Sequence, residues 1–451
     1  MTECHTHRVT TAAGGVELSR LRDYFLPLLM RNVATGGFPF IDPAVFPGER
    51  PGGGPAPDPE EALSKPGCII ASPSYRDALA EISQNYVFNW VRDAAIVAME
   101  LSTAALPDAL SSVLDDYVTF AARCQAGAPD ELDRAKYSIC GELVDWPPQN
   151  DGPALQGLAI LGLFGRLSDP VKDTARDVLS ADLRFVLQQY PQPNFNLWEE
   201  VNGQSLFTRS VQLKFLRAIA KNKVVAAPPE LADAVAWLSE RLPEHVENER
   251  YVSILDPKEP RLGYDPNADV IAACIYGAIQ PTDPVLLNTA AALRQAFTEG
   301  AGAYVINEAD AKRQIGPLIG RYPGDVYDGF HVSADEAGAS TGHPWVVCTA
   351  NYAELYYRVA AEIKRRHKVP EDPRAALFLA QAGCDKGATP SKVAAALRAA
   401  GDRMLQAIVY HSDHLELSEQ FHADTGYESS VRNLSWSYAS SLSALRARDA
   451  A

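Results

Sequence analysis

Residues 196–203 read Asn-Leu-Trp-Glu-Glu-Val-Asn-Gly and lead directly into a run of helical period over residues 204–221. A polar and aromatic cluster in front of such a run lies at the N-terminus of the predicted helix. Five further predicted helices begin in the same way, and the helix between successive members of the set lacks such a cluster. The other five clusters are 89–93, 146–153, 265–269, 343–345 and 431–436.

This alternation predicts the fold class. In a chain of helical hairpins every second helix runs in the same direction, so the six clusters gather at one end. We expect an all-α (α/α)6 barrel of six inner and six outer helices, with the active site at the N-terminal mouth of the inner helices. The expected helices cover 92–104, 107–126, 153–166, 170–189, 204–221, 228–243, 268–279, 284–298, 344–364, 390–410 and 433–447. An open α-solenoid is the alternative, but its repeats would be self-similar and of constant length.

The N-terminal part differs in composition from the rest. Residues 35–72 are rich in glycine and proline, which indicates an exposed arm after a leading helix. We therefore expect two parts: residues 1–72, an N-terminal helix and arm packed on the barrel, and residues 73–451, the catalytic (α/α)6 domain.

The net charge of −16 and the pI near 5.1 limit the possible partners. Nucleic acids and anionic membrane surfaces attract basic patches, so neither is an expected partner. A neutral or cationic small ligand fits this charge better, and we expect a monomer without a cofactor. The start of the chain has no secretory signal pattern, which predicts a cytoplasmic protein unless an upstream signal was removed.

The seven cysteines are scattered and odd in number, which favours reduced thiols over a disulfide framework. None pairs with histidine at a metal-ligand spacing, so we expect no metal site.

Two glutamates are candidates for acid–base chemistry. Glu199 has Glu200 as a neighbouring carboxylate and follows Trp198, and both features favour a protonated carboxyl, as a general acid needs. Alternatively, the pair only complements the dipole of the following helix. Glu419 lies shortly before the sixth inner helix, so it would face Glu199 across the mouth. A solvated loop residue is the other interpretation of Glu419.

Two carboxylates across a cleft are what glycosidic bond cleavage requires, and their separation decides whether the anomer inverts. Large aromatic residues at loop ends can pack against sugar rings, and charged groups beside them can bind hydroxyls. The charged candidates are Arg92, Asp93 and Arg321, although Arg92 and Asp93 could instead only cap a helix. The aromatic candidates are Tyr86, Trp90, Trp146, Trp198, Tyr327 and Trp345.

Six segments together resemble the motifs of fungal-type glucoamylases of glycoside hydrolase family 15, in the order of that family. They are 85–93, 149–155, 197–203, 320–323, 344–345 and 418–421, the last followed by 434–439.

The resemblance implies an exo-acting, inverting hydrolase that releases β-D-glucose from non-reducing ends of α-1,4-glucans and maltooligosaccharides. Glu199 would be the general acid and Glu419 the base. Arg92, Asp93 and Arg321 would bind the terminal glucose and Glu200 the next sugar. Leu197 and the aromatic candidates named above, Trp146 among them, would complete the substrate-binding pocket.

The chain departs from the family pattern at three places. Asn196 replaces the usual aspartate near the acid, Trp146 lies one residue closer to residues 151–153, and segment 328–342 is longer than usual. We expect no starch-binding domain, and therefore poor binding to starch granules. The same fold and mechanism could act on isomaltooligosaccharides, dextran or trehalose. A catalytically silent glucan-binding regulatory protein and a helical scaffold are further alternatives.

Overall fold

The structure is a computed structural model that describes the chain except for residues 1–14, 42–62, 75–84, 301 and 330–341. Six inner helices form a closed ring in which each helix contacts the next, and α16 contacts α3 to close it. The predicted (α/α)6 barrel is thereby confirmed. The inner helices are α3 (Val91–Thr103), α5 (Gly152–Leu163), α7 (Leu206–Lys221), α9 (Asp269–Ile275), α13 (Val346–Arg366) and α16 (Ser435–Ala450).

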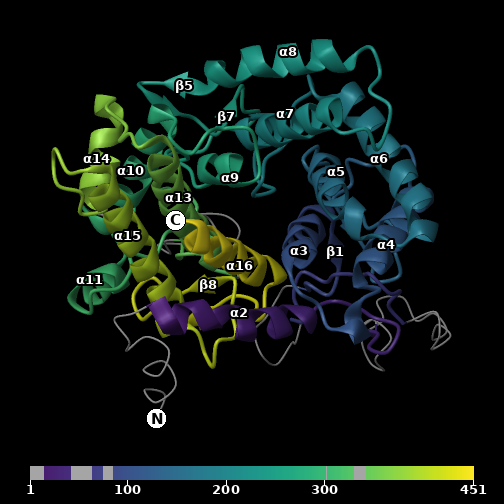
Figure 1. Ribbon diagram of the computed structural model, residues 1–451, viewed down its shortest axis with the longest axis horizontal. Coiled ribbons are helices and arrows are strands. Elements are labelled where there is room, and N and C mark those ends of the chain that lie inside the picture. The colour runs from purple at the N-terminus through teal and green to yellow at the C-terminus, as the bar shows by residue number, and fades with distance from the viewer. Residues whose placement is uncertain (1–14, 42–62, 75–84, 301, 330–341) are drawn as a thin grey trace.

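The outer helices surround this ring (Figure 1). They are α2 (Gly15–Met30), α4 (Val113–Gly127), α6 (Asp169–Gln189), α8 (Leu231–Arg241), α10 (Pro284–Thr298) and α15 (Pro390–His411). The leading helix α2 packs against α16 and α15 and is the sixth outer helix. The predicted division of the chain after residue 72 stays a prediction.

The observed helices overlap all eleven predicted runs. The sequence did not predict α11 (Val305–Lys312) or α14 (Ala376–Gln381), which are too short to show a clear period. Short 3₁₀ helices cover Asp108–Leu110, Phe164–Arg166, Leu242–His245 and Pro373–Ala375.

Small and apolar residues let the inner helices approach closely. A Cβ atom on Gly157 of α5 would lie 2.2 Å from the Phe215 ring of α7, so only glycine fits there. All seven residues of α9 are buried. The N-cap residue of helix α10 is Asp283, whose carboxylate accepts hydrogen bonds from the amides of Val285 (2.8 Å) and Leu286 (3.1 Å).

The strands are short and lie in the loops at the mouth and the rim. Antiparallel pairs join β1 (Asn89–Trp90) to β2 (Lys136–Tyr137), β5 (Val246–Glu247) to β6 (Arg250–Tyr251), and β8 (Gln420–Phe421) to β9 (Glu428–Ser429). A further, three-stranded sheet has the order β3 (Asn194–Phe195), β4 (Asn202–Ser205), β7 (Ile254–Leu255). The β1–β2 and β4–β7 pairs bring together loops that are about 50 residues apart, and so they help to position the site.

Some predictions concern residues outside the described part: the centre of the glycine- and proline-rich arm, Cys4, and most of segment 328–342. The six described cysteines are free thiols, four of them buried. In the part of the chain that the structure describes, no helix is long and apolar enough to cross a membrane.

Candidate active site

A cavity of about 750 Å³ opens where the inner helices begin. It brings together all thirteen residues that we predicted from the sequence: Tyr86, Trp90, Arg92, Asp93, Trp146, Leu197, Trp198, Glu199, Glu200, Arg321, Tyr327, Trp345 and Glu419. Residues not named as candidates also line it, among them Phe88, Lys136, Arg261 and Trp436.

Glu199 lies in a tight turn between β3 and β4. The Asn196 carbonyl accepts from the Glu199 amide (2.9 Å), and the Asn196 side-chain oxygen accepts from the amides of Glu200 and Val201 (both 3.1 Å). The backbone of Glu199 has φ = +65°, an uncommon conformation for a residue with a side chain. Asn196 therefore holds the turn that presents both glutamates, and its own amide nitrogen donates to the Tyr264 hydroxyl.

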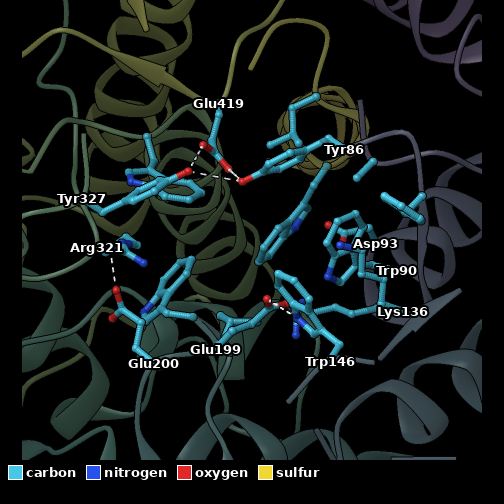
Figure 2. A pocket seen from close by; sticks show the side chains of 18 of the residues that line it. Tyr86, Trp90, Asp93, Lys136, Trp146, Glu199, Glu200, Arg321, Tyr327 and Glu419 are labelled. Atoms are coloured by element: carbon cyan, nitrogen blue, oxygen red, sulfur yellow. Dashed lines mark hydrogen bonds and ion pairs between the residues drawn. The ribbon is translucent and has the colours of Figure 1, made fainter. Parts of the chain in front are cut away.

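Two donors bind the Glu199 carboxylate. The Arg92 guanidinium lies 2.9 Å from Oε1. The Trp146 indole nitrogen donates to Oε2 at 2.6 Å (Figure 2). The indole that contacts Glu199 is thus that of Trp146, whereas the indole of the sequence neighbour Trp198 donates to Asn267 (2.9 Å). The side chain of Glu199 keeps 19% of its surface exposed, so it stays accessible from the cavity.

Glu200 has a different set of partners from Glu199. It accepts from Arg321 Nη2 (2.8 Å) and from the Tyr322 hydroxyl (2.7 Å), and Arg261 lies 3.3 Å away. We expected from the sequence that the two neighbouring carboxylates oppose each other's ionisation. The turn sends the two side chains to different walls, where Glu199 contacts Arg92 and Glu200 contacts Arg321. The expectation about their ionisation stays a prediction.

Glu419 comes from the opposite side of the cavity, just before β8 (Figure 2). Three hydroxyls donate to its carboxylate: Tyr86 to Oε1 (3.1 Å), Tyr327 to Oε2 (3.1 Å), and Ser430 to Oε2. Burial raises the pKa of Glu419, while the three hydroxyls and the nearby Arg321 act in the opposite direction. Glu419 is a buried carboxyl in an ordered hydroxyl cage, not a solvated loop residue.

Arg92 and Asp93 lie in the first turn of α3, at a buried end of the cavity. Arg92 Nη1 donates to Gln149 (2.8 Å) and to Asp151 (3.0 Å). Burial raises the pKa of Asp93 to about 7, against the opposing effect of Arg92. The N-cap position of α3 is Trp90, so neither residue is the cap that we considered as an alternative.

Aromatic rings form the walls between these charged groups. Trp90 packs against Tyr86 (ring centroids 5.6 Å apart) and Trp146 (5.7 Å), while Trp345 packs against Trp198 (5.7 Å) and Tyr327 (5.8 Å). The rings thus form two continuous surfaces suited to the C–H faces of sugars.

Lys136 is a site residue that we missed in the sequence. Its ammonium lies 3.9–4.5 Å from the ring centroids of Phe88, Trp90 and Trp146, and burial lowers its pKa to about 8. Only the pairing of β2 with β1, which sets Lys136 opposite Trp90, brings it to the cavity. Arg261 comes from the loop after β7 and carried no local signal either.

In the described part of the chain, no group of three or more His, Cys, Asp or Glu side chains is arranged to hold a metal ion. Gly342, at the end of segment 328–342, donates its amide to the carbonyl of Asp325 (2.7 Å), the residue whose carboxylate binds Arg321.

Comparison with known proteins agrees with this geometry. The sequence model described as "Glycosyl hydrolases family 15" matches residues 61–446. The chain is 27% identical to a "Probable glucoamylase" of Schizosaccharomyces pombe, over 85% of both chains. It is 28% identical to "Glucoamylase, intracellular sporulation-specific" of Saccharomyces cerevisiae, over 85% of this chain and 79% of that protein.

Solved structures have the same fold. The glucoamylase from Saccharomycopsis fibuligera superposes with a TM-score of 0.74 at 23% identity, covering 96% of this chain and 95% of that one. A glucoamylase from Hypocrea jecorina gives 0.76 at 23% identity, covering 96% and 72%.

Proposed function

The chain belongs to glycoside hydrolase family 15 and is a glycoside hydrolase, and we propose that it is an exo-acting, inverting enzyme that releases β-D-glucose from α-1,4-glucans and maltooligosaccharides. One observation carries the proposal: Glu199 and Glu419 enter a single aromatic-walled cavity from opposite sides (Figure 2). The names of the relatives, which are glucoamylases, support a glucan as the substrate.

The proposed mechanism uses the two carboxyls in different roles. Glu199, in its protonated form, gives its proton to the glycosidic oxygen as the C1–O bond breaks. Glu419 takes a proton from a water whose oxygen bonds to C1 on the opposite face of the sugar, so the product is the β anomer. The three hydroxyls that donate to Glu419 orient its carboxylate for this task.

The buried end of the cavity supports exo action. Arg92 and Asp93 are almost completely buried there and would bind the hydroxyls of a terminal glucose. Arg321 would hold the same sugar, and Glu200, bound to Arg321, the next one. Trp90, Trp146, Trp198 and Trp345, with Tyr86, Tyr327 and Leu197, would pack against the sugar rings.

Proton NMR of fresh reactions with maltose, maltotriose, isomaltose and trehalose tests the proposal. We expect β-glucose to appear first, and faster from the two α-1,4-linked sugars. α-Glucose as the first product would mean a retaining mechanism and would overturn the roles of Glu199 and Glu419. Preferential cleavage of isomaltose or trehalose would mean that the enzyme prefers another linkage. No cleavage at all would favour a glucan-binding protein.

A further inference from the structure

Arg261 lines the cavity and contacts the carboxylate of Glu200, which the more deeply buried Arg321 also contacts. Its Nη1 lies 3.3 Å from Glu200 Oε1 and 3.3 Å from the Tyr322 hydroxyl. The side chain of Arg321 is only 4% exposed, whereas that of Arg261 is 35% exposed. Glu200 therefore lies between an inner guanidinium and an outer one, and the outer one faces the mouth.

The loop that carries Arg261 is locked to the neighbouring backbone. The Gly324 amide donates to the Gly263 carbonyl at 2.9 Å, and a Cβ atom on Gly324 would lie 2.2 Å from the Leu262 carbonyl oxygen. This close approach holds the backbone next to Arg261 against the segment that carries Tyr322. A side chain at the rim that is placed in advance loses less entropy when it binds a ligand.

The donors of Arg261 are only partly used. Its two contacts with described residues, to Tyr322 and Glu200, both involve Nη1. A guanidinium carries donors on Nε and on both terminal nitrogens. The Nε and Nη2 donors are thus available to a ligand that enters past Glu200.

We propose that Arg261 is a specificity-determining residue, which binds hydroxyls of the sugar on the leaving-group side of the cleaved bond. The proposal rests on the proposed function, in which the terminal glucose occupies the buried end with Arg92 and Asp93. The next sugar then lies nearer the mouth, beside Glu200 and within the region that Arg261 lines. Arg261 makes the enzyme select for a sugar, rather than any other leaving group, at this position.

α-D-Glucosyl fluoride, whose leaving group is fluoride, tests whether Arg261 acts on the leaving-group side at all. A simpler role, in which Arg261 only holds Glu200, would also spare this fluoride, so Arg261→Met is repeated in the Glu200→Gln background. A further loss on maltose in that background is expected if Arg261 contacts the sugar itself, and no further loss would overturn the proposal. We would compare kcat/KM for maltose and for this fluoride in the Arg261→Met and Arg261→Lys variants. The matched control is Arg365→Met, which removes an exposed arginine paired with Glu362 on α13.

We expect Arg261→Met to lower kcat/KM for maltose about tenfold more than for glucosyl fluoride, since a charge-assisted hydrogen bond is lost with maltose alone. The loss on maltose should be mainly an increase in KM, and Arg261→Lys should recover part of it. Arg365→Met should leave kcat/KM unchanged for both substrates. Equal losses on both substrates, or no loss on maltose, would overturn the proposal.

A binding measurement keeps this result separate from the proposed function. In the Glu199→Gln background, calorimetry with maltose and glucose requires no turnover. Arg261→Met should weaken maltose binding about tenfold and glucose binding much less; equal weakening would overturn the role of Arg261. If the unmodified protein cleaves neither maltose nor glucosyl fluoride, the proposed function fails, while the binding comparison still decides the role of Arg261.

Discussion

Glu199 and Glu419 face one cavity, yet their surroundings are opposite in kind. Glu199 lies on a strained turn, remains partly exposed, and contacts a guanidinium and an indole N–H. Glu419 is only 3% exposed, and within the described part of the chain its carboxylate accepts hydrogen bonds from three hydroxyls. The difference teaches that the fold distinguishes two chemically identical side chains by the charge and the water around them.

The comparison also corrects an expectation. From the sequence we considered burial only beside Glu199, but burial raises the pKa of Glu419 on the opposite wall. Removing either glutamate, or one partner of each, therefore tests how far the two walls differ.

The largest effect is expected at Glu199 itself. Glu199→Gln should lower kcat for maltose by about 10³-fold, because it removes the proton donor, while maltose should still bind because the aromatic walls remain. The rate of glucose formation gives kcat, and calorimetry gives the affinity for maltose. Glu308→Gln, which changes an exposed glutamate paired with Lys312, is the control. Loss of maltose binding in Glu199→Gln would count against its role as the acid.

The next effect concerns the partner of Glu199. Trp146→Phe keeps an aromatic wall but removes the indole donor at 2.6 Å, so kcat/KM should fall by roughly 10- to 100-fold. Steady-state kinetics with maltotriose measures this. Trp237→Phe, on α8 against Tyr190 and outside the cavity lining, is the control and should retain full activity. An unchanged rate in Trp146→Phe would mean that this hydrogen bond does not help the acid.

On the other wall, Ser430→Ala removes one of the three hydroxyl donors to Glu419. Those donors stabilise the carboxylate, so their loss raises its pKa further. A base must be ionised, and the acidic limb of kcat/KM against pH should therefore move upward by about half a pH unit to one unit. A downward shift would contradict the assignment of Glu419 as the base. Ser180→Ala on α6, outside the cavity lining, should leave the profile unchanged.

The smallest effect concerns the free energy of unfolding and involves Asp93, the neighbour of Arg92. Aspartate in the unfolded chain ionises near pH 4, whereas Asp93 in the fold keeps its proton up to about pH 7. The folded state thus binds more protons in this window, so its free energy of unfolding falls as pH rises from about 4 to 7.

Asp93→Asn should remove this pH dependence and stabilise the protein at pH 7 by on the order of 1 kcal/mol, with little change at pH 4. Arg92 keeps Asp151 and Gln149 as partners in that variant. Thermal unfolding at both pH values measures the difference. Asp173→Asn, at an exposed ion pair of α6, is the control, and an equal gain at pH 4 and pH 7 would refute the argument.

The helical period and the clusters at the helix starts were sufficient to predict the barrel, because both are local properties of the chain. The predicted run 204–221 matches α7 (Leu206–Lys221) closely, and the cluster before it does lie at the mouth. The motif order was sufficient to collect thirteen cavity residues. We did not identify Lys136 and Arg261 from the sequence, because nothing near them in the sequence distinguishes them from surface cations.

What the sequence by itself determined is therefore the long helices of the barrel, their alternation between two layers, and the residues at one end of the barrel. Only the tertiary structure decided which side chains touch: Tyr86 with Glu419, Arg92 with Glu199, and Arg321 and Arg261 with Glu200. These pairs are between 61 and 333 residues apart. Helix periodicity extends over a few residues, whereas protonation depends on charges and burial within a few ångströms in space, and only ring closure brings those together.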